Sequence, residues 1–190
     1  MADAVIKVYH AGFSRIESPD VGIGRRNADF GGGFYTSPDP GFVSRWARVR
    51  AGSETYINEY EFDTEGLSVK RLSRGAEWFD IIYAYRNGLG DPLSGFDAAI
   101  GPVANDTLYD VWGVTTSGLI SPGQALALLS VGPQYTQIAV KSARAASRLR
   151  FISANVISRD DAASYREVVL REQDLFREAF LEQAEKLGLT

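Results

Sequence analysis

The sequence predicts an α+β fold in one domain, and three observations support this prediction. Short runs of strand type are spread over residues 4–157. Between them lie segments whose apolar residues recur with helical spacing. A long amphipathic segment follows at residues 160–187. We therefore expect one domain over residues 1–158 and an amphipathic helix within residues 159–190, which packs on the domain or on a partner.

Local patterns place the elements in order along the chain. Strand-type runs lie at residues 4–9, 34–37, 55–62, 67–72, 96–100, 135–140 and 151–157. Helical patterns lie at residues 40–51, 76–87, 122–129, 143–149 and 160–187. Residues 63–66 are typical of a hairpin turn between the third and fourth strands.

Two helix starts carry a specific signal. Asp39 and Pro40 are typical of an N-cap and a first helical position, and Ser121 with Pro122 repeats that pattern. The helix expected at residues 76–87 has one apolar stripe, formed by Trp78, Ile81, Ile82 and Tyr85.

Composition excludes several classes of function. The 190 residues include no cysteine and one histidine, so disulfides, thiolate metal sites and multi-histidine metal centres are excluded, and we expect no metal. A net charge of −4 gives no electrostatic footprint for general nucleic-acid binding. A local basic cluster suits a phosphate, an acidic partner or a plain solvated face; it consists of Lys141, Arg144, Arg148 and Arg150. We expect no signal peptide and no membrane span, and hence a cytoplasmic protein.

The most distinctive stretch is the glycine run Gly31–Gly33, which is followed at once by Phe34 and Tyr35. Glycine lets the backbone adopt positive φ angles and approach a ligand closely. An aromatic face beside exposed backbone N–H groups suits a flat, partly anionic ligand. The alternative is a turn that leads into an ordinary core strand, since neither GxGxxG nor GK[ST] is present.

His10 lies at the end of the first expected strand, beside small residues. A side chain at that position can project into a cleft, although a lone histidine is also compatible with a structural or exposed role. A serine–histidine–acid hydrolase would need a nucleophile that the sequence does not identify, because no G-x-S-x-G nucleophile elbow is present. Among the 24 acidic residues, no spacing selects a carboxylate pair for a glycosidase.

Several sequence blocks taken together resemble the ADP-ribosyltransferase superfamily. Residues 8–20 begin Val-Tyr-His-Ala-Gly, residues 29–37 read Asp-Phe-Gly-Gly-Gly-Phe-Tyr-Thr-Ser, and residues 44–47 read Ser-Arg-Trp-Ala. The diphtheria-toxin-like branch has a Tyr-His-Gly strand end and a Gly-x-Tyr-Thr strand. The chain resembles more closely a bacterial family of uncharacterised, transferase-like proteins, which also shares Ile-Gly-Pro-Val-Ala-x-Asp at 100–106 and Thr-Gln-Ile at 136–138. The resemblance covers roughly residues 5–157.

This resemblance implies a split, mostly antiparallel pair of sheets that grips NAD as a co-substrate. It implies His10, Tyr35 and Gln137 as catalytic residues, with His10 hydrogen-bonded on the adenosine-ribose and diphosphate side of NAD and Tyr35 stacked on nicotinamide. It also implies cofactor-binding positions at His10, Ala11, Gly12, Arg26, Asn27, Phe30, Gly31, Gly33, Phe34, Tyr35 and Asp106. Position 11 is Ala where the family pattern has Gly.

Gln137 stands where the superfamily usually has Glu. A carboxylate stabilises developing positive charge, whereas an amide supplies only a dipole and hydrogen bonds. Asp106 and Asp110 are candidate substitutes for the missing acid.

Three hypotheses follow from the sequence. The first is an ADP-ribosyltransferase that modifies a macromolecule, protein or nucleic acid, as the toxin of a bacterial toxin–antitoxin pair with an antitoxin partner. The second is an NAD glycohydrolase on the same scaffold, with water as the acceptor. The third is a non-catalytic module that binds NAD or a partner, which the neutral Gln137 favours.

Overall fold

The computed structural model describes residues 4–24, 26–47, 50, 52–104 and 118–189. The strands are β1 (Val5–Gly12), β2 (Phe34–Thr36), β3 (Thr55–Asp63), β4 (Val69–Arg71), β5 (Ala98–Pro102), β6 (Thr136–Val140) and β7 (Leu149–Ile157). The helices are α1 (Pro40–Trp46), α2 (Ala76–Arg86), α4 (Pro122–Leu129), α5 (Ala143–Ala146) and α6 (Arg159–Lys186), with a 3-10 turn η1 (Val21–Ile23).

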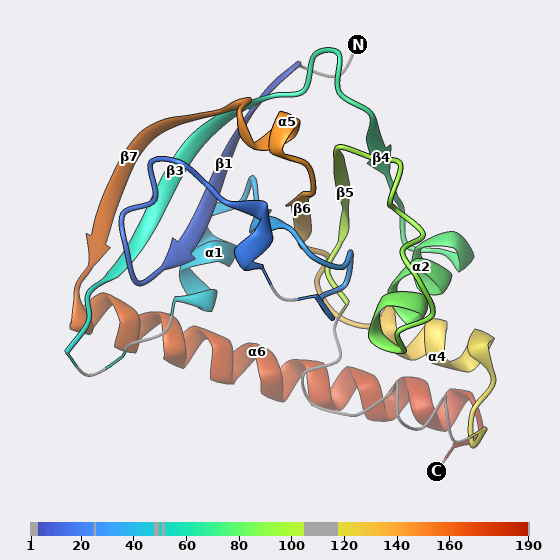
Figure 1. Cartoon of the computed structure of the whole chain (residues 1–190). Helices are drawn as coiled ribbons and strands as arrows, with labels where there is room; N and C mark the ends of the chain where they lie inside the picture. Colours follow the sequence, from blue (N-terminus) through green and yellow to red (C-terminus); the bar gives the residue numbers. More distant parts are fainter. Residues whose placement is uncertain (1–3, 25, 48–49, 51, 105–117, 190) are drawn as a thin grey trace.

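The strands form two mostly antiparallel sheets (Figure 1). One sheet has the order β1-β3-β7 and the other the order β2-β6-β5-β4, in which only the β4–β5 pair is parallel. Tyr9 of β1 and Ser37, just after β2, exchange two backbone hydrogen bonds of 2.8 and 3.0 Å. This bridge fixes the edge of one sheet against the edge of the other.

A hydrophobic core fills the space between the two sheets. Alternate residues of each strand face this core, because successive side chains in a strand point to opposite faces. The core includes Val8, Phe34, Tyr60, Ile138 and Val140.

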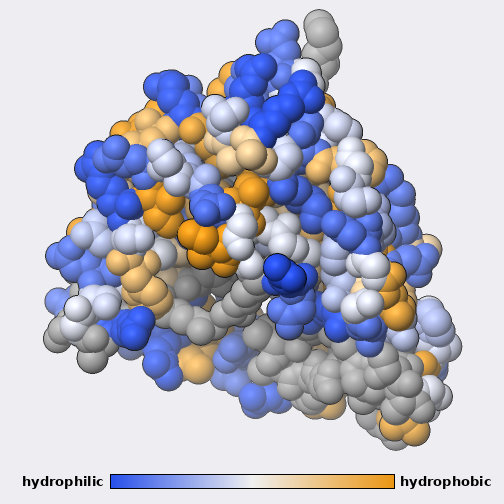
Figure 2. Space-filling view, in the orientation of Figure 1, coloured by the Kyte–Doolittle hydropathy of each residue, from blue (hydrophilic) through white to orange (hydrophobic). Residues whose placement is uncertain are grey.

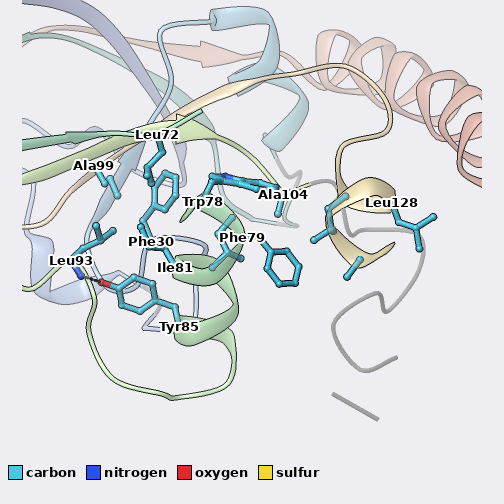
Figure 3. Packing of buried hydrophobic residues seen from close by; sticks show 14 of the residues in the cluster. Phe30, Leu72, Trp78, Phe79, Ile81, Tyr85, Leu93, Ala99, Ala104 and Leu128 are labelled. Atoms are coloured by element: carbon cyan, nitrogen blue, oxygen red, sulfur yellow. Dashed lines mark hydrogen bonds between the residues drawn. The ribbon is translucent and has the colours of Figure 1, made fainter. Parts of the chain in front are cut away.

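A second core lies on the other face of the four-stranded sheet, against α2. Trp78 is fully buried there, and its indole N–H donates to the Pro102 carbonyl oxygen at 2.9 Å. Phe30 lies among Leu72, Trp78 and Leu93 (Figure 3). Phe30 precedes the glycine run, so this packing anchors that run to the core.

Helix α6 runs beneath both sheets along the base of the molecule (Figure 1). It contacts α1 and α4, and its residues Phe180 and Ala184 belong to the second core. Arg45 of α1 binds both Tyr135 and Glu172, the latter at 2.8 Å, which ties α6 to the start of β6.

The order of strands and helices agrees with the sequence prediction, with three corrections. The helix predicted at 143–149 ends at Ala146, because Leu149 already pairs with Phe62 at the start of β7. The predicted hairpin at residues 63–66 is wrong, because β3 already pairs on both sides with β1 and β7 and leaves β4 no free edge. The helix predicted at 40–51 ends at Trp46. There the Ala47 N–H donates to Ser44 oxygen in a tight final turn, and Ala47 itself is extended.

Candidate functional site

The glycine run forms a tight turn immediately before β2. Gly31 has a φ of 73°, a left-handed conformation that favours glycine, and its N–H donates to Ala28 oxygen at 2.9 Å. A Cβ atom at this position would lie 2.3 Å from Tyr85 Cε1. The turn therefore requires glycine at position 31 for both conformation and space.

The Tyr35 side chain folds back onto this turn. Its hydroxyl accepts a hydrogen bond from Phe30 N–H at 2.9 Å and donates one to Gly31 oxygen at 2.8 Å. Burial raises the pKa of this hydroxyl above its ordinary value. Tyr35 therefore stays protonated and holds the turn and β2 in one arrangement.

Lys141 fixes the turn from the other side. Its Nζ donates to Phe30 oxygen at 2.7 Å and to Gly32 oxygen at 3.2 Å, and it lies 4.9 Å from the centre of the Tyr85 ring. Burial lowers the pKa of Lys141 below its ordinary value. Together with Tyr35, this side chain provides a donor to each of three consecutive carbonyl groups.

His10 lies at the junction of the two sheets. Its Nδ1 is 2.7 Å from the Tyr35 carbonyl oxygen, which can only accept, so Nδ1 carries the proton. The imidazole also packs on the Phe34 ring at 4.4 Å between centres, and burial lowers the pKa of His10. Within the described part of the chain Nε2 has no hydrogen-bond partner. His10 thus offers the Nε2 lone pair as an acceptor.

Gln137 is buried in the middle of a polar network and is only 3% exposed. Its Nε2 donates to Asp29 Oδ2 at 2.7 Å and to Pro102 oxygen at 3.2 Å. Asp29 also accepts from Ala104 N–H at 3.0 Å and forms an ion pair with Arg86. An acid therefore does contact Gln137, and that acid is Asp29.

The three predicted catalytic side chains are not all on one face of the four-stranded sheet. Tyr35 pairs with Ala139, and Gln137 is two residues from Ala139, so the side chains of Tyr35 and Gln137 share a face. Phe34 points to the opposite face, and the His10 ring packs on Phe34. His10 reaches Tyr35 through the main chain of β2 rather than through its side chain.

An open cleft of about 920 Å³ lies beside the glycine turn. Its lining includes Arg26, Asn27, Gly32, Tyr85, Arg86 and Lys141. Lys141 lies 4.0 Å from Asp91 here, and Arg86 is paired with Asp29, so two of its cations already have acidic partners. The face seen in Figure 2 has hydrophobic surface near its centre with hydrophilic residues around it.

The comparisons with known proteins give one match. Residues 6–151 match the model of a family described as a protein of unknown function, DUF3990. The chain belongs to the DUF3990 family. No curated protein matches the chain, and no solved structure matches it.

The DUF3990 match contains the contacts of the glycine turn, His10 and Gln137 described in this subsection, and it ends within β7, before α6. Over the ranges that the structure describes, no group of three or more His, Asp or Glu side chains is placed to hold a metal ion. Within the same ranges no helix combines the length and the apolar character needed to cross a membrane.

The other predicted binding residues of this DUF3990 chain are distributed around the turn. Arg26 and Asn27 are exposed on the cleft, and Gly12 ends β1 beside the His10 ring. Ala11 is half-buried in β1, Gly33 and Phe34 are buried at β2, and the Phe30 ring lies in the core. Asp106 and Asp110 lie outside the described residues.

Sequence reasoning missed three residues of this site: Asp29, Arg86 and Lys141. Asp29 stood in the Asp-Phe-Gly-Gly-Gly block, but nothing in the local pattern separates a buried acid from a turn aspartate. The sequence pattern places Lys141 in a basic cluster, although this residue directly follows the strand of Gln137. Its position next to that strand was the one available signal.

Proposed function

We propose that this protein is an NAD-dependent ADP-ribosyltransferase. It would cleave the bond between nicotinamide and ribose and transfer ADP-ribose to a macromolecule. The sequence blocks that resemble this superfamily motivate the proposal. The observation that carries it furthest is the state of His10, a neutral imidazole with Nδ1 held by the β2 main chain and Nε2 available.

A neutral imidazole in this tautomer accepts a hydrogen bond at Nε2. A ribose hydroxyl of NAD is a suitable donor, and the lowered pKa keeps the lone pair free near neutral pH. Because Nδ1 is bound to Tyr35 oxygen, the ring is already oriented before a ligand arrives. Such preorganisation reduces the entropic cost of binding.

Tyr35 suits a stacking role in this proposal. Its ring is half-buried, and its hydroxyl is held at the glycine turn by Phe30 and Gly31. An aromatic ring fixed at its far end presents a rigid face, and nicotinamide is a flat aromatic group that stacks on such a face.

In the proposed reaction the bond from ribose C1′ to the nicotinamide nitrogen breaks, and its electron pair leaves with neutral nicotinamide. C1′ becomes oxocarbenium-like and is attacked by a nucleophile of the acceptor, which then loses its proton. Gln137 is proposed to accept a hydrogen bond from the nicotinamide ribose and so orient that ribose. Because an amide carries no charge, we expect slower turnover than with a glutamate at this position.

We further propose that the acceptor is a macromolecule of a bacterial cytoplasm and that the protein acts as a toxin with an antitoxin partner. This part rests on the resemblance alone.

Incubation of bacterial extract with NAD labelled in its adenylate moiety tests the proposal. We expect label on a macromolecule with the wild-type protein and none with His10→Ala, while Lys7→Ala retains transfer. Lys7 is a matched control, since it lies in β1 and forms an exposed ion pair with Glu59. Equal labelling by wild type and His10→Ala would refute the proposal. Nicotinamide release without label would favour the glycohydrolase.

A further inference from the structure

We infer that Asp29 is a positioning residue that holds the Gln137 amide with its carbonyl oxygen toward the substrate. This inference rests on the proposed function for its catalytic consequence. Its structural part stands on the contacts of Asp29 and Gln137 alone.

The amide nitrogen of Gln137 has two acceptor partners. A primary amide has two N–H donors, and here Nε2 is 2.7 Å from Asp29 Oδ2 and 3.2 Å from Pro102 oxygen. Both partners are pure acceptors, a carboxylate and a carbonyl. The opposite amide orientation would place Oε1 against two acceptors, so these two partners fix which end of the amide faces inward.

The amide oxygen of Gln137 has a different environment from its nitrogen. Among the described residues Oε1 of Gln137 has no hydrogen-bond partner, although the side chain is only 3% exposed. Oε1 is therefore an acceptor that no described residue uses. A glutamate carboxylate at this position would offer the same acceptor function to a ribose hydroxyl.

Asp29 brings a carboxylate into contact with the neutral amide of Gln137. Asp29 keeps its carboxylate buried with hydrogen bonds from Ala104 N–H and Gln137 and an ion pair with Arg86. A hydrogen bond from an amide N–H to a carboxylate polarises the amide and strengthens its carbonyl oxygen as an acceptor. Asp29 thus partly supplies the negative character that Gln137 lacks.

The side-chain amide signals of Gln137 test the structural part without any catalytic readout. We expect its two protons in the ¹H–¹⁵N spectrum, assigned by their absence in Gln137→Glu, to exchange with water at least about tenfold more slowly than those of exposed Gln134. In Asp29→Asn this protection should fall, because the carboxylate acceptor is gone. Exchange as fast as that of Gln134 in the wild type would overturn the inference.

Nicotinamide release tests the catalytic part. We expect Asp29→Asn to lower kcat by at least about tenfold with little change in KM for NAD, since the interaction acts on the bond-breaking step. Asp63→Asn is the matched control, an acid of the other sheet that binds Arg148. Unchanged kcat in Asp29→Asn beside a loss in Gln137→Ala would overturn the positioning role.

The two proposals fail in different ways. If the wild type releases no nicotinamide, the proposed function fails, while slow amide exchange that depends on Asp29 still supports the orientation of Gln137. If release occurs but the amide exchanges freely, the inference fails and the proposed function stands.

Discussion

The Nδ1 atom of His10 lies 2.7 Å from the carbonyl oxygen of Tyr35. This hydrogen bond crosses from β1 to β2 beside the Tyr9–Ser37 bridge, so it joins the two sheets. It also fixes the tautomer of the imidazole, with the proton on Nδ1. The position of Nε2 is therefore set by the main chain of β2. A change in the glycine turn before β2 is expected to shift the imidazole of His10 as well.

The lowered pKa of His10 predicts a specific pH dependence of stability. Burial disfavours the imidazolium in the folded protein, whereas the unfolded chain binds its proton near the ordinary value of 6.5. Between these two pKa values the unfolded state holds more protons, so the free energy of unfolding falls as the pH is lowered through this window.

We expect urea unfolding across a pH series to show this loss of stability more strongly in the wild type than in His10→Gln. The glutamine can still donate to Tyr35 oxygen but does not titrate. Identical pH profiles for the two proteins would contradict the assignment of a neutral, buried His10.

Tyr35→Phe is expected to destabilise the protein while the aromatic ring remains. The substitution leaves the Phe30 N–H and the Gly31 carbonyl without their partner. An unsatisfied buried polar group costs about 1–3 kcal/mol, so we expect the free energy of unfolding in urea to fall by that amount. Tyr165→Phe should change it by less than about 0.5 kcal/mol, because no hydrogen bond of the Tyr165 hydroxyl occurs among the described residues. Equal effects would mean that the two hydrogen bonds of the Tyr35 hydroxyl contribute nothing to stability.

Gly31→Ala and Gly32→Ala form a matched pair in the glycine turn. A Cβ at position 31 meets Tyr85 at 2.3 Å with a left-handed backbone, whereas at position 32 no atom lies within 4 Å. We expect calorimetry to show a loss of at least about 2 kcal/mol for Gly31→Ala and less than about 0.5 kcal/mol for Gly32→Ala. A well-tolerated Gly31→Ala would refute the described turn.

Two substitutions in α6 test whether this helix packs on its own domain. Phe180 is 8% exposed and lies in the second core, whereas Leu175 is 66% exposed. We expect Phe180→Ala to lower the free energy of unfolding by about 3 kcal/mol and Leu175→Ala by less than about 0.5 kcal/mol. The urea midpoint of each variant measures this difference. Similar small losses in both would indicate that α6 is not needed for the stability of the domain.

Features set by neighbouring residues were predictable from the sequence. Asp39 accepts from Phe42 N–H as the N-cap of α1, and Ser121 with Gln124 forms a capping box at α4. The buried stripe of α2 also follows from its apolar spacing, since Trp78, Ile81, Ile82 and Tyr85 are all buried. Each of these signals lies within one turn of a helix or along one of its faces.

Features that join distant parts of the chain were not predictable in the same way. Gln137 and Asp29 are 108 residues apart, and Lys141 and Phe30 are 111 apart. Strand periodicity shows which face a residue occupies but not which strand lies beside it. For the same reason the sequence suggested that β4 turns back on β3, although β4 pairs with β5.

Nicotinamide release from NAD by the purified protein tests the central claim most directly, with Tyr35→Ala and Lys7→Ala measured beside the wild type. We predict release by the wild type and by Lys7→Ala, and a loss of release in Tyr35→Ala. A wild-type protein that neither releases nicotinamide nor binds NAD would contradict the account.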